Sequence, residues 1–208
     1  MSKLQSKRSA RTQAGRRPAR SGKDQPDSPT PWSQRTMVWA GLGSVLNWAA
    51  FPPLDFGWLA WFALIPWLML IRREELEGKR PYRWLWAAGF AFWLTSVYWL
   101  SLPHPATFMG CIAISMALAC YPPVFVLLSR TAVHRFKIPL IVAAPVVWAG
   151  LEYWRAHFLT GFAFAMLGHT QRAWISLIQV ADLGGAYAVG FLVAFVGACL
   201  ARMIPCGR

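Results

Sequence analysis

The sequence predicts an all-α integral membrane protein, a bundle of about six transmembrane helices preceded by a disordered basic tail. Hydrophobic residues make up 56% of the 208 residues and charged residues only 14%, whereas soluble domains carry about 25% charged residues. Long apolar runs alternate with short basic clusters, which is typical of helices that cross a bilayer. The 13 Trp and 13 Phe also exceed what a soluble core of this size needs.

The tail is residues 1–35, and the transmembrane bundle is residues 36–208. The tail holds nine Lys or Arg and two Asp and is rich in Ser, Gln and Pro, a composition that favours disorder. It is not a secretory signal, because the first apolar run begins only at Met37. A basic tail can bind nucleic acid. Beside a membrane span, the better interpretation is a cytoplasmic tail close to anionic headgroups, worth about 1 kcal/mol per basic residue.

Six apolar segments are the predicted spans: Met37–Phe51, Phe56–Ile71, Trp84–Leu102, Ala106–Leu128, Ile138–Trp154 and Gly185–Ile204. The first two have 15 and 16 residues, short of the ~20 that a bilayer needs, and must include the flanking aromatic residues. Pro52-Pro53 cannot continue a helix. The chain therefore turns there into a tight hairpin, with Asp55 in water at the turn. Pro122-Pro123 should kink the fourth span.

The basic residues predict the orientation of the spans. With a cytoplasmic N-terminus, 19 of the 21 Lys and Arg lie on the cytoplasmic side, and only Arg155 and Arg172 lie outside. The positive-inside rule favours this multi-pass topology. One apolar stretch, Phe158–Leu167, has only 10 residues and contains Gly161. It is too short to cross, so we expect a re-entrant or interfacial loop on the outer side, with Phe162 and Phe164 in lipid or against the fifth span.

No common catalytic motif is present. The sequence has no G-x-S-x-G, P-loop, G-x-G-x-x-G, H-E-x-x-H or C-x-x-C, and its five Lys lie in the tail and the predicted cytoplasmic loops. The cysteines show no metal-ligand spacing and are expected to pack as small hydrophobes: Cys111, Cys120, Cys199 and Cys206. His157 and His169 have no third ligand at suitable spacing. We therefore expect no metal, no cofactor and no catalytic residue in this chain.

Charged residues at the outer ends of the spans are the remaining candidates. Glu152 and Arg155 are three apart, on one helix face, at the outer end of the fifth span. They form either an interface ion pair in an aromatic belt, beside Trp148, or a site that positions a lipid headgroup. Asp182 precedes the last span and is predicted to cap its helix.

Three stretches resemble the amino-terminal membrane half of bacterial apolipoprotein N-acyltransferase. They are "AAFPPLDFGWLAWFALIPWLMLI", "GFAFWLTSVYWLSL" and "APVVWAGLEYWRAHFLTGFAFAMLGHTQ", and the resemblance covers roughly residues 37–204. The third stretch is the most specific. This resemblance and the predicted outer-side position make a set of residues candidates for facing lipid or substrate. They are Asp55, Trp148, Glu152, Arg155, Gly161, Phe162, Phe164, Gly168 and Gln171.

The resemblance implies an enzyme of the bacterial inner membrane that moves an acyl chain from phospholipid onto the amino-terminal cysteine of a lipoprotein. In the family, a nitrilase-like domain on the outer side supplies a Glu-Lys-Cys triad. This sequence stops at Arg208 and contains no match to that domain, and it reads "GFAF" where the family commonly reads "GFPW". Its phospholipid and lipoprotein partners are therefore implied by the resemblance alone.

Three hypotheses follow for the function. The first is a truncated or split acyltransferase, a lipid-handling membrane module that is inactive alone. The second is a membrane scaffold that docks a separate nitrilase-type protein. The third is a small transporter, which is disfavoured because no span carries paired charges at its midplane and no inverted repeat is visible.

Overall fold

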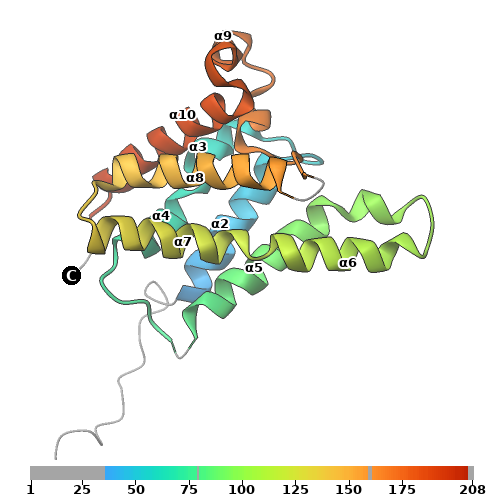
Figure 1. Ribbon diagram of the computed structural model, residues 1–208, viewed down its shortest axis with the longest axis horizontal. Coiled ribbons are helices and arrows are strands. Elements are labelled where there is room, and N and C mark those ends of the chain that lie inside the picture. Colours follow the sequence, from blue (N-terminus) through green and yellow to red (C-terminus); the bar gives the residue numbers. More distant parts are fainter. Residues whose placement is uncertain (1–35, 79, 159–160, 206–208) are drawn as a thin grey trace, which may run out of the picture. The chain divides into compact units, whose positions relative to one another are not determined.

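The computed structural model of the chain describes residues 36–78, 80–158 and 161–205 (Figure 1). Every regular element among these residues is a helix, and no strand occurs in them. The all-α prediction is therefore confirmed for the described part of the chain. The predicted basic tail, residues 1–35, and Cys206 lie outside it.

The helices follow the predicted apolar segments, with some of these segments divided. The α-helices of the described residues are α2 (Thr36–Ala50), α3 (Ala60–Ala63), α4 (Ile65–Arg72), α5 (Pro81–Ser96), α6 (Thr107–Leu118), α7 (Tyr121–Arg130), α8 (Leu140–His157), α9 (Ile175–Ile178) and α10 (Ala181–Met203). The shorter turns are the 3-10 helices η2 (Gly57–Leu59), η3 (Tyr98–Ser101) and η5 (Leu167–Gln171), and the π-helical turn η4 (Thr131–Arg135).

Two helical stretches of the described chain are long and apolar enough to cross a membrane. Thr107–Arg135, which comprises α6, α7 and η4, has 29 residues, and Ala181–Met203 has 23. Gly57–Arg72 is a shorter apolar stretch. By length and composition, these stretches fit the coarse prediction of membrane-crossing helices. The full set of about six spans belongs to the proposal made below.

The first two apolar segments form the predicted hairpin at Pro52-Pro53. α2 ends at Ala50, and the amide of Asp55 donates to the carbonyl of Phe51 at 3.0 Å. The chain then returns through η2, α3 and α4, which pack against α2. Asp55 is exposed at the turn, as predicted. The end of the helix bundle that carries this turn is called the turn end below.

The fourth predicted span is interrupted near its two prolines. α6 ends at Leu118 and α7 begins at Tyr121, so Pro122 lies in the first turn of α7. A proline is tolerated there because its missing N–H would have no partner within the helix. A Cβ on Gly89 of α5 would lie 2.9 Å from Pro122 Cγ, so a glycine allows the close approach of α5. The helix is thus interrupted just before the two prolines, where the sequence predicts a kink.

Small residues allow α10 to pack closely in the bundle. Ala194, Ala198 and Ala201 lie three or four residues apart and are fully buried, a pattern that lets helix backbones approach each other. α10 packs along α8 and also contacts α3 and α4. α8 in turn packs on α7, and the two run side by side in Figure 1. This packing fixes the position of α8, which carries the charged pair of the candidate site.

Two arginines bind helix carbonyls at the end of the bundle opposite the turn end. Arg72 donates to Ile204 O at 2.6 Å, and Arg130 donates to Leu70 O and Glu74 O, each at 2.8 Å. The last carbonyls of a helix lack partners within it and attract cations. These two residues of the basic clusters therefore also join the ends of α4, α7 and α10.

The start of α10 corrects one prediction. Asp182 does not cap this helix, because Val180 occupies the N-cap position and no side chain caps it there. Asp182 lies one residue inside the first turn, where a negative charge still suits the helix dipole. The helix is interrupted at Gly184 and Gly185. The φ of 66° at Gly185 is a conformation that favours glycine.

Candidate functional site

Two charged residues of α8 are buried at the turn end of the bundle. Glu152 and Arg155 lie on one face of the helix because they are three residues apart. Their side chains are only 3% and 5% exposed. Burying a charge costs free energy unless hydrogen bonds or an opposite charge compensate. Their partners therefore decide what this part of the molecule does.

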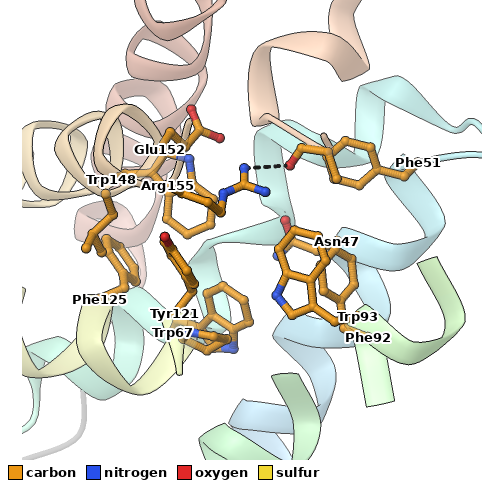
Figure 2. A pocket seen from close by; sticks show the side chains of 13 residues that line it. Asn47, Phe51, Trp67, Phe92, Trp93, Tyr121, Phe125, Trp148, Glu152 and Arg155 are labelled. Atoms are coloured by element: carbon orange, nitrogen blue, oxygen red, sulfur yellow. Dashed lines mark hydrogen bonds between the residues drawn. The ribbon is translucent and has the colours of Figure 1, made fainter. Parts of the chain in front are cut away.

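Arg155 binds the loop that follows α8. Its guanidinium donates to the carbonyls of Phe164 and, at 3.3 Å, Ala165, and Figure 2 shows the second bond as a dashed line. Its own carbonyl accepts the amide of Phe162 at 2.9 Å. The guanidinium carbon also lies 5.0 Å from the ring centre of Trp93 and 5.6 Å from that of Tyr121, which is within the range of cation–π contacts. Arg155 thus joins the loop to α5 and α7.

Glu152 binds the same loop two residues further on. Its Oε1 accepts the amide of Leu167 at 2.6 Å. Its Oε2 has no hydrogen-bond partner among the described residues. A Cβ on Gly190 of α10 would lie 2.8 Å from Oε2, so a glycine there makes room for the carboxylate. The prediction that Glu152 and Arg155 form an ion pair in direct contact is wrong. Each side chain binds main-chain groups of the chain after α8 instead.

The loop, residues 161–166, is irregular and leads into η5, which agrees with the prediction of a loop rather than a span. Gly161 has a φ of 72°, and a Cβ there would lie 2.2 Å from Ala156 O. Ala165 also has a positive φ, 51°, which is uncommon for a residue with a side chain. A Cβ on Gly168 would lie 2.4 Å from Ala186 O of α10. Backbone approach at both glycines therefore excludes larger residues.

The aromatic side chains of the loop contact helices other than the fifth predicted span. Phe162 contacts Trp93 of α5 with ring centres 6.1 Å apart, and Phe164 contacts Trp99 of η3 at 5.7 Å. Their ring contacts are therefore with α5 and η3 rather than with the fifth predicted span, α8. Phe162 is half-buried, whereas Phe164 stays exposed.

The loop region is also tied to the hairpin turn between α2 and η2. Arg172 forms a salt bridge with Asp55, and both side chains are exposed. Gln171 is fully buried and donates from Nε2 to Gly57 O at 2.8 Å. A Cβ on Gly57 would lie 2.1 Å from Thr170 O. The two segments that are predicted to lie on the outer side therefore meet at one end of the bundle.

A cavity of about 40 Å³ lies beneath the loop, between α2, α4, α5, α7 and α8 (Figure 2). Its walls are mostly aromatic, and Arg155 and Glu152 lie at its polar side. The residues that line it are Asn47, Phe51, Trp67, Phe92, Trp93, Tyr121, Pro122, Phe125, Trp148, Leu151, Glu152, Arg155 and Ala165. Its volume admits a few water-sized groups.

Two polar residues of this cavity, Asn47 and Tyr121, were not among the candidates predicted from the sequence, because those candidates were ionisable residues near the ends of the apolar segments. A neutral amide such as Asn47 within an apolar run is the signal that could have revealed one of them. The structure shows that Asn47 Nδ2 donates to Gly43 O at 2.9 Å and to Ala63 O at 3.3 Å. Trp148, which was a candidate, lines the cavity with its Nε1 unpaired within the described chain.

The turn end offers no evident nucleophile or metal site in the residues that the structure describes. Cys111 is buried and donates to Val97 O, and no group of three His, Cys, Asp or Glu is close enough to hold a metal ion. The side chain of His157 lies against Tyr153, with ring centres 4.2 Å apart. Desolvation and the positive charge of Arg155 lower the pKa of His169, which favours the neutral imidazole. The hydrogen bonds of Glu152 and Arg155 are thus suited to shaping the loop.

Comparison with known proteins decides the family. Residues 43–199 match the model of the apolipoprotein N-acyltransferase N-terminal domain. The chain belongs to this family. It is 39% identical over 179 residues to the apolipoprotein N-acyltransferase of Rhodopirellula baltica, covering 79% of this chain and 31% of that protein. It is 34% identical over 180 residues to the apolipoprotein N-acyltransferase of Geobacter metallireducens, covering 82% of this chain and 34% of that protein.

The matches define which part of the family's proteins this chain resembles. A third relative, apolipoprotein N-acyltransferase 1 of Treponema denticola, is 26% identical over 81% of this chain and 31% of its own length. The chain thus spans about a third of the length of these three relatives. The matched region includes Glu152, Arg155 and the loop, so the site described above lies inside the region that matches the family's N-terminal domain.

Proposed function

We propose that this chain is the membrane module of an apolipoprotein N-acyltransferase, which acts in lipoprotein maturation at the bacterial inner membrane. In this proposal the module holds phospholipid and lipoprotein at its turn end, while the bonds are made and broken by a nitrilase-like domain. The observation that carries the proposal is that Arg155 binds the loop, residues 161–166, and Glu152 binds Leu167, the first residue of η5. Both contacts lie within the family-matched region.

The buried charges have a specific part in this proposal. Irregular backbone at membrane depth is tolerated only where protein satisfies its polar groups. Arg155 and Glu152 supply these partners for Phe164, Ala165 and Leu167. The loop can therefore lie at the outer interface with its exposed aromatic Phe164 toward lipid. The candidates Gly161, Gly168 and Gln171 support its shape. Phe162 packs the loop against α5, Trp148 lines the cavity beneath it, and Asp55 binds Arg172 after η5.

We further propose that the helices form about six spans with a cytoplasmic N-terminus. The turn end then faces the outer side, and the end with Arg72 and Arg130 faces the cytoplasm. The 19-to-2 distribution of basic residues supports this orientation. The Asp55–Arg172 salt bridge is consistent with it, because it brings together two segments that the orientation places on the outer side.

This chain alone should not transfer acyl groups. A thiolate nucleophile needs an adjacent base or cation, and all five Lys of the sequence lie at positions 3, 7, 23, 79 and 137, in the predicted tail and cytoplasmic loops. Purified protein incubated with phospholipid and a diacylated lipopeptide should give no triacylated product above a blank without enzyme. A version with all four cysteines replaced by Ser is the control. Turnover that survives in this control would show that the catalytic argument is wrong.

A further inference from the structure

The cavity beneath the loop carries polar groups from three different helices among its aromatic walls. Asn47 belongs to α2, Tyr121 to α7 and Arg155 to α8. Two further polar atoms, Trp148 Nε1 and Glu152 Oε2, are enclosed by other atoms and cannot be reached from the cavity. The polar groups of Asn47, Tyr121 and Arg155 therefore decide what can occupy this space.

The side chain of Asn47 turns its oxygen toward the cavity. Its Nδ2 donates to Gly43 O at 2.9 Å and to Ala63 O at 3.3 Å. Both partners are carbonyl oxygens, so the nitrogen must face them and Oδ1 lies on the other side of the amide. Figure 2 shows this oxygen on the side of the Arg155 guanidinium. Oδ1 accepts no hydrogen bond from the described chain and, unlike Trp148 Nε1, it is not enclosed.

Tyr121 and Arg155 supply hydrogen-bond donors to the same space. The Tyr121 hydroxyl has no partner in the described part of the chain and is not enclosed either. The guanidinium of Arg155 has five N–H groups, of which two donate to the carbonyls of Phe164 and Ala165. The guanidinium carbon lies 5.6 Å from the ring centre of Tyr121. Donors and an acceptor thus border one small cavity.

The chemistry of these groups restricts the occupant to a small neutral molecule that both donates and accepts. A cation would be repelled by Arg155. An anion would face the Asn47 oxygen and lie beside the carboxylate of Glu152. An apolar group would leave Oδ1 without a donor, which is unfavourable. Water donates to the amide oxygen and accepts from the hydroxyl and the guanidinium, and a buried water typically makes about three such bonds.

We propose that this cavity holds ordered water that links Asn47, Tyr121 and Arg155 across α2, α7 and α8. The volume of about 40 Å³ suits roughly three molecules, since one needs about 10–15 Å³. The water hydrates a guanidinium that is only 5% exposed and so lowers the free-energy cost of burying its charge. The water site goes beyond the proposed function, because it requires neither acyl transfer nor a particular orientation in the membrane.

Radiolytic footprinting tests this proposal on the full chain in nanodiscs. A millisecond X-ray pulse converts water into hydroxyl radicals, which oxidise the side chains next to each water, and mass spectrometry maps the products. Trp93 and Phe125 line the cavity and are 4% and 0% exposed. We expect both to be oxidised, because water lies beside them. Cys111 is buried away from the cavity and should stay unmodified, although thiols are reactive.

Two variants and a matched control make the test specific. Asn47→Leu removes the acceptor at similar volume and should lower the oxidation of Trp93 and Phe125 at least about fivefold. Tyr121→Phe removes only a hydroxyl and should act in the same direction. Ser44→Ala is the control, since Ser44 is buried on α2 but does not line this cavity. The melting temperature shows that each variant is folded, and Tyr121→Phe decides the matter if Asn47→Leu does not fold.

Two results would overturn the proposal. Trp93 and Phe125 as unreactive as Cys111 would mean that the cavity is dry or filled by a lipid tail. Unchanged oxidation in the folded variants would mean that these polar groups hold no water. Acyl transfer is not measured in this experiment, so either result would leave the proposed function standing.

Discussion

Substitution of Glu152 tests directly whether this side chain holds the loop. The amide of Leu167 donates to Glu152 Oε1 at 2.6 Å and has no helical partner, since it begins η5. A hydrogen bond to a charged group contributes about 1.5–3 kcal/mol. Glu152→Ala should therefore raise the hydrogen-exchange rate of the Leu167 amide about 10- to 150-fold. Glu152→Gln keeps an acceptor oxygen but loses the charge, so its effect should be about tenfold smaller.

The measurement is hydrogen–deuterium exchange with single-amide readout on the protein in nanodiscs. The amide of Phe162 is an internal control, because it donates to the main-chain carbonyl of Arg155 and not to a side chain. It should stay protected in both variants. Unchanged exchange at Leu167 would refute the assigned role of Glu152. Equal increases at Leu167 and Phe162 would also refute it, since they would indicate opening of the whole region.

Two further predictions concern packing and topology. Gly168→Ala places a Cβ 2.4 Å from Ala186 O and should destabilise the protein by about 1–3 kcal/mol or more. In the control Gly150→Ala on α8, the new Cβ meets open space, so the protein should be equally stable or more stable by up to about 1 kcal/mol. Thermal unfolding in detergent measures both variants, and equal melting temperatures would contradict the packing at Gly168. For topology, single cysteines at positions 169 and 162 are placed in a cysteine-free background, and a membrane-impermeant thiol reagent is added outside intact cells. Position 169 should be labelled readily and position 162 poorly, because His169 is exposed and Phe162 packs against Trp93. Labelling of position 169 only after the membrane is opened would reverse the proposed orientation.

Features set by local chemistry were predictable from the sequence. Pro52-Pro53 ends α2, and Pro122 marks the break between α6 and α7. Both effects are local, because proline lacks the backbone N–H and its ring clashes with the preceding turn of a helix. The loop after α8 was predictable because the apolar stretch Phe158–Leu167 has only 10 residues, too few to cross a membrane. Glu152 and Arg155 stood out because charged residues are rare in apolar segments.

The partners of these residues were not predictable in the same way. The spacing of Glu152 and Arg155 favours an ion pair, but both bind main-chain groups, which carry no signal in the sequence. Phe162 was expected in lipid or against the fifth span and contacts Trp93 of α5, because tertiary packing decides which helix a loop side chain meets. Asp182 is not the cap because α10 already begins at Ala181, before the two glycines, so Val180 takes the N-cap position.

A chimera tests the central claim most directly. Residues 36–204 of this chain replace the matched amino-terminal third of the Rhodopirellula baltica relative, and the fusion is assayed for transfer of an acyl group from phospholipid to a diacylated lipopeptide. The proposal predicts that the chimera is active and that Arg155→Ala, which releases the carbonyls of Phe164 and Ala165, lowers its activity at least about tenfold. Gly150→Ala is the matched control and should keep full activity. A folded, membrane-inserted chimera without activity, beside an active parent enzyme, would contradict the claim that this chain is an acyltransferase membrane module.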